Sequence, residues 1–112
     1  MKGNNIGELE ELILITILIL KEEAHLLRIQ EELKNEAGRS LVMGALHNTL
    51  SRLEKKEYLN SFLGEPTKQR GGRRKRLYEL TAQGKNKVVE LHQIRMNMWN
   101  KVSYPGFNIN NV

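Results

Sequence analysis

The hydrophobic pattern starts with an apolar run at residues 12–20, LILITILIL, directly after the acidic residues Glu8, Glu10 and Glu11. Acidic side chains stabilise the positive N-terminal end of a helix dipole, so the pattern predicts a helix over residues 7–20. The β-branched residues in the run would also suit a strand. Because the run is apolar on every side, we expect this helix to be buried in the middle of the fold. Its nine residues are too few to cross a bilayer, which takes about 20.

Two amphipathic segments follow and predict a second helix over residues 24–37 and a third over residues 43–56. Their apolar stripes consist of Leu26, Ile29 and Leu33 in the second helix and of Leu46, Leu50 and Leu53 in the third. Gly38 occupies the position where glycine commonly ends a helix. Residues 39–41 then form a short connection or a strand of a single bridge. Two helices joined in this way are the helix-turn-helix pattern, although any helical hairpin shows it.

A basic hairpin makes the pattern more specific. Residues 58–63 and 76–80 alternate between apolar and polar side chains and predict two antiparallel strands, with a loop over residues 64–75 between them. Thr81 suits the N-cap of a last helix that extends to about residue 102. Two helices followed by a hairpin with a charged tip are typical of a winged helix-turn-helix. We therefore predict a mainly α fold with a small β-hairpin, a winged helix-turn-helix with an added C-terminal helix.

Composition and charge narrow the range of partners. The 112 residues suffice for one domain, and an apolar fraction of 39% fits a domain that keeps some apolar surface for a partner subunit. Residues 1–36 carry four basic and eight acidic residues, whereas residues 37–112 carry 14 basic and five acidic ones. Residues 68–76, KQRGGRRKR, hold six positive charges. This asymmetry indicates a polyanionic partner, nucleic acid rather than a membrane.

The composition also excludes several kinds of site. A chain without cysteine has no disulfides, thiolate zinc sites or cysteine nucleophiles, which agrees with a cytoplasmic protein. The first residues do not resemble a signal peptide. His25, His47 and His92 lack partners at metal-binding spacing. The chain has no aspartate, its serines lack a histidine at motif spacing, and Gly71-Gly72 lacks the context of a phosphate-binding loop, so we expect neither an enzyme nor a cofactor.

Three stretches of the chain resemble the PadR family of bacterial transcriptional regulators: GELEELILITIL (7–18), GRSLVMGALHNTLSRLEKK (38–56) and LGEPTKQRGGRRKRLYELTAQG (63–84). With the spacing between them they extend over residues 7–84. The combination of the GALxxTLxRLExK helix and the GGRRKR-Y-LT hairpin is more specific than either half. The resemblance implies a winged helix-turn-helix repressor that acts as a homodimer, with a C-terminal helix that crosses to the other subunit.

The chain departs from the family pattern at three positions. His47 stands where the family usually has tyrosine, on the helix that the resemblance places in the DNA groove. Glu57 stands where a glycine normally ends this helix, so we expect its cap to be made in another way. Val42 occupies the expected N-cap of the same helix, where a polar residue is preferred.

We expect DNA contacts from the third helix and from the basic hairpin. Residues at the start of a helix in the major groove reach base edges or phosphates, and glycines let a loop approach the backbone closely. The candidates on or before the helix are Ser40, Met43, Gly44, His47, Asn48, Ser51 and Arg52. The candidates in the hairpin are Arg70, Gly71, Gly72, Arg73, Arg74 and Lys75. Asn48 could read adenine, and Arg52 could bind a phosphate or a guanine. Alternatively, Lys75 and Arg76 stabilise the hairpin itself through the acidic first half of the chain.

The last helix is the expected dimerisation element. Candidates for the dimer interface are Leu12, Val88, Leu91, Ile94, Met98, Trp99 and Val102. Packing at this interface is the favoured role for Trp99. The alternative is a pocket that Trp99 and Met96 line for a small hydrophobic or aromatic effector. We thus predict a DNA-binding domain over residues 1–80, a dimerisation helix over residues 81–102 and a flexible tail over residues 103–112.

Our preferred interpretation is a homodimeric transcriptional regulator in the bacterial cytoplasm, a repressor that binds double-stranded DNA at an imperfect palindrome. Each subunit would place its third helix in a major groove and its hairpin on the flanking backbone. The competing interpretation is a protein-interaction module whose basic hairpin binds an acidic protein. The arginine density of the hairpin favours DNA.

Overall fold

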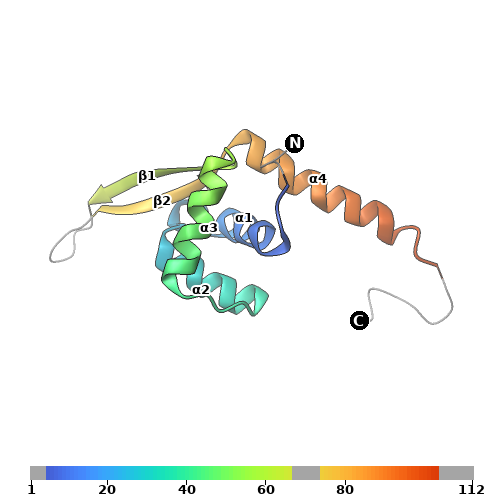
Figure 1. Ribbon diagram of the computed structural model, residues 1–112, viewed down its shortest axis with the longest axis horizontal. Coiled ribbons are helices and arrows are strands. Elements are labelled where there is room, and N and C mark those ends of the chain that lie inside the picture. Colours follow the sequence, from blue (N-terminus) through green and yellow to red (C-terminus); the bar gives the residue numbers. More distant parts are fainter. Residues whose placement is uncertain (1–4, 67–73, 104–112) are drawn as a thin grey trace.

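The computed structural model of the chain describes residues 5–66 and 74–103 (Figure 1). In chain order the elements are α1 (Glu8–Leu20), the 3-10 turn η1 (Lys21–Glu23), α2 (Leu26–Ala37), α3 (Met43–Lys55), β1 (Leu59–Pro66), β2 (Arg74–Leu80) and α4 (Ala82–Trp99). This order confirms the predicted mainly α fold with a small β-hairpin. Apart from residue 103, the expected flexible tail lies outside the described residues. No helix within the described ranges has the length and apolarity that a membrane span needs.

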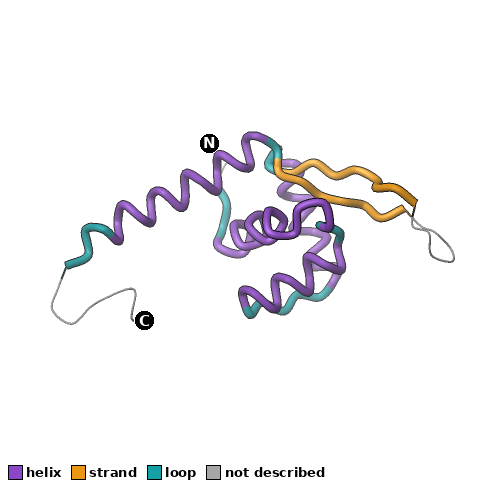
Figure 2. The backbone as a smooth tube through the Cα atoms, turned by 180° about the vertical axis from the view of Figure 1, so that it is seen from behind, coloured by secondary structure: helices purple, strands orange, loops and turns teal. Residues whose placement is uncertain are grey.

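Helices α1, α2 and α3 form a bundle, with α1 behind α3 in the view of Figure 1. The hairpin β1–β2 extends from one side of this bundle and α4 extends from the other, as Figure 2 shows from behind. The base of the hairpin contacts α3, and α4 contacts α1 and β2. Helix α4 then extends away from the bundle, and its residues after Leu91 are exposed.

The core is built from the apolar stripes that the sequence predicts. The fully buried residues include Ile13 and Leu14 of α1, Ile29 and Leu33 of α2, and Leu46, Leu50 and Leu53 of α3. Tyr58, Leu59, Tyr78 and Leu80 of the hairpin and its approach are also buried, together with Val88 of α4. One core thus joins the bundle, the base of the hairpin and the start of α4.

Helix α1 is not covered on every side, which corrects the prediction made from its apolar run. Ile15, Leu18 and Ile19 are 38%, 41% and 48% exposed, whereas Ile13 and Ile17 on the other side are buried. In a single chain α2, α3 and the first half of α4 do not surround α1 completely. An apolar face of α1 is consequently left at the surface.

Two helices end in the left-handed conformation. Gly38 ends α2 with a φ of 67°, and its amide donates to the Lys34 carbonyl oxygen at 3.0 Å. Glu57 follows α3 with a φ of 66°, and the next amide, that of Tyr58, donates to the Leu53 carbonyl oxygen at 3.0 Å. The expectation of a different cap is therefore wrong. Glutamate adopts the conformation that glycine favours, at a cost of about 1 kcal/mol.

The strands of the hairpin are longer than the sequence pattern predicts. Leu59 pairs with Leu80 and Leu63 with Arg76, and an irregularity in register then precedes the pair formed by Pro66 and Arg74. Residues 64–66 and 74–75 of the predicted loop over residues 64–75 therefore belong to the strands, and the rest of that loop lies outside the described residues. Arg74 and Lys75 belong to β2 rather than to the tip of the hairpin.

Backbone contacts join strand β2 of the hairpin to the segment of the chain that connects α1 with α2. The Tyr78 amide donates to the Ala24 carbonyl oxygen at 2.9 Å, and His25 forms an isolated bridge with Leu77. A single bridge was a sequence-based expectation for residues 39–41, but the structure forms it at His25. The hairpin is thereby fixed to the start of α2.

The junction between the hairpin and α4 depends on a close backbone approach. Thr81 is the N-cap of α4, as predicted: its hydroxyl accepts from the Gly84 amide at 2.9 Å and donates to the Glu57 carbonyl oxygen at 2.7 Å. A Cβ atom on Gly84 would lie 2.2 Å from the Tyr58 carbonyl oxygen. Since this neighbour is backbone, a side chain here requires α4 to shift.

We expect Gly84→Ala to lower the free energy of unfolding by about 1–3 kcal/mol, because overpacking forces backbone displacement. Urea denaturation measures the change. Gly44→Ala is the matched control, since a Cβ at Gly44 meets nothing within 4 Å. That variant should gain up to about 1 kcal/mol from helix propensity. Equal stabilities for the two variants would contradict the close approach at Gly84.

Candidate nucleic-acid interface

Helix α3 presents a polar stripe on the side opposite its buried leucines. Successive helical residues are rotated by about 100°, so Gly44, Asn48, Ser51 and Lys55 fall on one line along the helix. Gly44, Asn48 and Lys55 are exposed, and Ser51 is half-buried. The sequence-based candidates did not include Lys55, although helical periodicity places it on this stripe.

The start of α3 lies open at the surface. Ser40, before the helix, is exposed, and Met43 at its first position is half-buried. Val42 is the N-cap and makes no side-chain cap, as its apolar side chain implies. A Cβ at Gly44 would meet nothing, so the helix surface here is accessible to another molecule.

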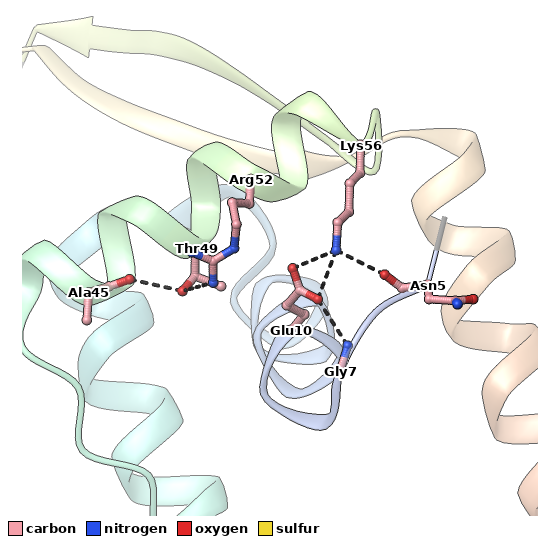
Figure 3. Close-up of polar contacts among 7 residues, drawn as sticks. All are labelled: Asn5, Gly7, Glu10, Ala45, Thr49, Arg52 and Lys56. Atoms are coloured by element: carbon pink, nitrogen blue, oxygen red, sulfur yellow. Dashed lines mark hydrogen bonds and ion pairs between the residues drawn. The ribbon is translucent and has the colours of Figure 1, made fainter. Parts of the chain in front are cut away.

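His47 and Arg52 flank the polar stripe on opposite sides. Arg52 Nη2 donates to Thr49 Oγ1 at 3.1 Å, and this hydroxyl donates to the Ala45 carbonyl oxygen at 3.0 Å (Figure 3). Thr49 is only 4% exposed. The guanidinium of Arg52 is therefore held near the edge of the buried face, whereas Lys55 is on the outward face.

The C-terminal end of α3 is tied to the start of α1. Lys56 Nζ donates to the two carboxylate oxygens of Glu10 at 3.1 and 3.0 Å and to the Asn5 carbonyl oxygen at 2.9 Å (Figure 3). Glu10 also accepts from the Gly7 amide at 3.0 Å. The carboxylate thus caps α1 and orients α3 at the same time.

A series of side-chain hydrogen bonds connects the hairpin with α3. Arg76 Nη1 on β2 donates to Ser61 Oγ on β1 at 3.0 Å, and Ser61 Oγ donates to Glu54 Oε2 on α3 at 2.9 Å. Burial, and then the Glu54 carboxylate, raise the pKa of Tyr78, whereas Arg76 lowers it. Arg76 therefore joins β2 to β1 and, through Ser61, to Glu54 of α3, and not to the acidic first half of the chain.

The basic residues of β2 remain at the surface. Arg74 Nε donates to the Gly64 carbonyl oxygen at 2.9 Å, and both Arg74 and Lys75 are exposed. The other hairpin candidates, Arg70, Gly71, Gly72 and Arg73, lie outside the described residues. Exposed cations of this kind are suited to binding phosphates.

The candidate dimer residues divide between the core and the surface. Val88 is 7% exposed and packs in the core of its own chain, and Leu12 and Leu91 are half-buried. The exposed members are Ile94, Met98, Trp99 and Val102. Arg95, between them, forms a two-fold ion pair with Glu11 of α1, in which Nη2 lies 2.6 Å from Oε1 and Nη1 contacts Oε2.

A shallow hollow of about 230 Å³ lies beside Trp99 and is lined by Arg95, Met98 and Val102 as well. Met96, the expected partner of Trp99 in an effector pocket, does not line it. The structure therefore brings Trp99 together with Met98 rather than with Met96. Across the described residues, no group of histidines and carboxylates is placed to hold a metal ion.

Comparison with known proteins identifies a family and solved structures to which the chain is similar. The family model for the transcriptional regulator PadR-like family matches residues 14–90, more than half of the chain. A PadR-like transcription factor from Bacteroides fragilis is 31% identical, with a TM-score of 0.61 over 82% of this chain and 84% of that chain. No curated protein sequence matches the chain significantly.

Two further solved structures share the fold. A PadR family transcription regulator from Clostridium difficile R20291 is 24% identical, with a TM-score of 0.63 over 81% of this chain and 91% of that chain. A PadR-like transcriptional regulator from Bacillus cereus is 20% identical, with a TM-score of 0.62 over 85% and 93%. The chain therefore belongs to the PadR-like family of transcriptional regulators, and it is a DNA-binding regulator rather than an enzyme.

Proposed function

We propose that the chain acts as a homodimeric repressor that binds an imperfect palindrome in double-stranded DNA, in the cytoplasm of a bacterium. Each subunit places α3 in a major groove and its hairpin on the flanking phosphates. The observation that carries this proposal is that His47, which flanks the outward stripe of α3, and Lys75 of β2 line one common groove. The two elements can therefore meet the same side of a duplex.

The polar stripe suits readout of bases. Asn48 can donate to and accept from the edge of an adenine, and Gly44 lets the backbone of α3 approach the groove. Ser40, Met43 and Ser51 border this surface. Arg74 and Lys75, with Arg70, Gly71, Gly72 and Arg73 beyond the described residues, would bind phosphates and supply affinity that does not depend on sequence.

The apolar surfaces that the single chain leaves uncovered support dimerisation. Ile15 and Ile19 of α1 are exposed, as are Ile94 and Met98 of α4. The ion pair of Arg95 with Glu11 holds these two helices together, so their exposed apolar residues lie on adjoining elements. Contiguous apolar patches on a soluble protein mark interaction sites. A second copy of the chain would cover these residues.

The hollow beside Trp99 supports an effector site within this interface. Met98 and Val102 supply apolar surface there, and Arg95 supplies charge. A small hydrophobic or aromatic molecule fits this composition. Such a ligand would bind where α4 meets the second subunit and would change the separation of the two α3 helices.

We expect Ile94→Asp to convert the dimer to a monomer, because it places a charge in the apolar interface. Loss of the second half-site contact should weaken binding to the promoter of its own gene by about 100-fold or more. Sedimentation equilibrium gives the subunit number, and titration of the promoter fragment gives the affinity. The wild-type chain should bind that fragment more tightly than random DNA and lower transcription from it.

Val89→Asp is the matched control. Val89 is 64% exposed on α4 but lies about 140° around the helix from Ile94. This variant should keep the dimer and the DNA affinity of the wild type. A monomeric wild-type chain, or one without preference for its promoter, would contradict the proposal. A wild-type chain that binds no DNA at all would favour an acidic protein partner instead.

Lys55→Ala should reduce the salt dependence of DNA binding more than Arg52→Ala. Each lysine on a phosphate contributes about one unit to the slope of log K against log salt. Lys55 is on the outward stripe, whereas Arg52 is held by Thr49. Titrations at several salt concentrations measure both slopes. The opposite order would show that Arg52 leaves Thr49 to bind DNA.

A further inference from the structure

A groove of about 410 Å³ separates the hairpin from the start of α2 and from α3. It is lined by His25, Leu26, Leu27, His47, Lys75, Arg76 and Tyr78. These residues come from three elements and from the turn before α2. The groove is therefore a product of the fold and cannot be recognised as a motif in the sequence.

Four of the side chains that line the groove are basic: those of His25, His47, Lys75 and Arg76. The side chains of His25, His47 and Lys75 form no hydrogen bond or ion pair with any described residue. Arg76 is partly engaged by Ser61, but it adds charge at the same edge. Among the described residues that line the groove there is no carboxylate. Such a concentration of basic side chains favours an anion, and the positive end of the α2 dipole adds to the same field.

We propose that this groove binds one phosphate group, and that in the DNA complex it holds a backbone phosphate between α3 and the hairpin while His25 takes up a proton. Lys75 supplies a permanent charge, His47 contacts the phosphate from α3, and His25 forms the floor of the groove. This inference rests on the proposed placement of α3 and the hairpin on DNA. It adds a phosphate contact that depends on pH.

The surroundings of His25 explain why its proton is linked to the anion. Burial, followed by Lys75 and Arg28, lowers the pKa of His25, whereas Glu23 of η1 and Glu31 of α2 act in the opposite direction. His47, Arg76 and Tyr78 complete the titratable and charged groups that face it across the groove. In the absence of an anion the ring is therefore uncharged near neutral pH.

A phosphate in the groove reverses this balance. Its negative charge stabilises the imidazolium and raises the pKa of His25 in the complex above that of the free protein. Between these two pKa values, binding takes up a proton. The affinity for DNA therefore increases as pH falls through this interval, by at most about tenfold per pH unit for each proton taken up. Above the pKa of the complex the dependence disappears.

The test uses a short duplex of arbitrary sequence, because a phosphate contact does not depend on the bases. Its affinity is measured at constant ionic strength from about pH 6 to about pH 8, where histidines titrate. We expect the wild type to bind several-fold more tightly at the lower pH, His25→Gln to show a flatter response, and His92→Gln, an exposed histidine of α4, to behave as the wild type.

A second variant keeps the test valid if His25→Gln disturbs the fold. Lys75 is exposed, so Lys75→Ala leaves the core intact. It should reduce the salt slope by about one unit and weaken the pH response. The proton uptake would not belong to His25 if His25→Gln kept the pH response of the wild type. The same would follow if only His47→Gln lost that response. Unchanged DNA binding in both His25→Gln and Lys75→Ala would overturn the groove but leave the proposed function standing.

Free phosphate is distinguished from DNA phosphate by competition. Sodium phosphate is compared with sodium chloride at equal ionic strength in the same titration. Stronger inhibition by phosphate in the wild type, lost in Lys75→Ala, shows that the groove also binds the free anion. Equal inhibition by the two salts, with the expected variant effects, assigns the groove to the DNA backbone. A wild-type chain that binds no duplex would overturn both the groove and the proposed function.

Discussion

The arrangement of the elements depends on three carboxylates in the first turn of α1, each of which binds a cation from another part of the chain. Glu8 pairs with Arg39 in the turn between α2 and α3. Glu10 pairs with Lys56 at the end of α3, and Glu11 pairs with Arg95 of α4. One helical turn thus links the helix-turn-helix to α4.

These three pairs differ in what they contribute. The Glu8–Arg39 pair is exposed, with side-chain exposures of 71% and 40%, so it contributes about 0–1 kcal/mol to stability. The Glu11 side chain is 7% exposed, so loss of its partner would leave a carboxylate largely out of water. The effect of the cluster is therefore mainly geometric. It links the end of α3 and the C-terminal part of α4 to the same turn of α1.

Much of the fold follows from local sequence, and the rest depends on distant contacts. The leucine stripes of α2 and α3, the glycine after α2 and the threonine before α4 act within a few residues, and the structure confirms them. The acidic start of α1 indicated a helix N-terminus, but its partners are 31, 46 and 84 residues away. Periodicity contains no information on such distant pairs.

The candidate site was predictable to a similar degree. The sequence identified α3 and the basic hairpin, and helical geometry then separates the outward Lys55 from Arg52, which Thr49 holds. The length of β2 depends on an irregular register near Pro66, so Arg74 and Lys75 were expected in the loop. The uncovered face of α1 could not be predicted, because an apolar run does not show which of its sides the rest of the chain covers.

Amide hydrogen exchange in α4 tests the central claim most directly, namely that the α1 carboxylates hold α4 to the DNA-binding bundle. In Glu11→Gln the amides in the half of α4 around Arg95 should exchange faster than in the wild type, with little change in α2. Glu22→Gln, which removes an exposed carboxylate of η1, should leave α4 unchanged. Equal exchange of the α4 amides in Glu11→Gln and in the wild type would contradict the account.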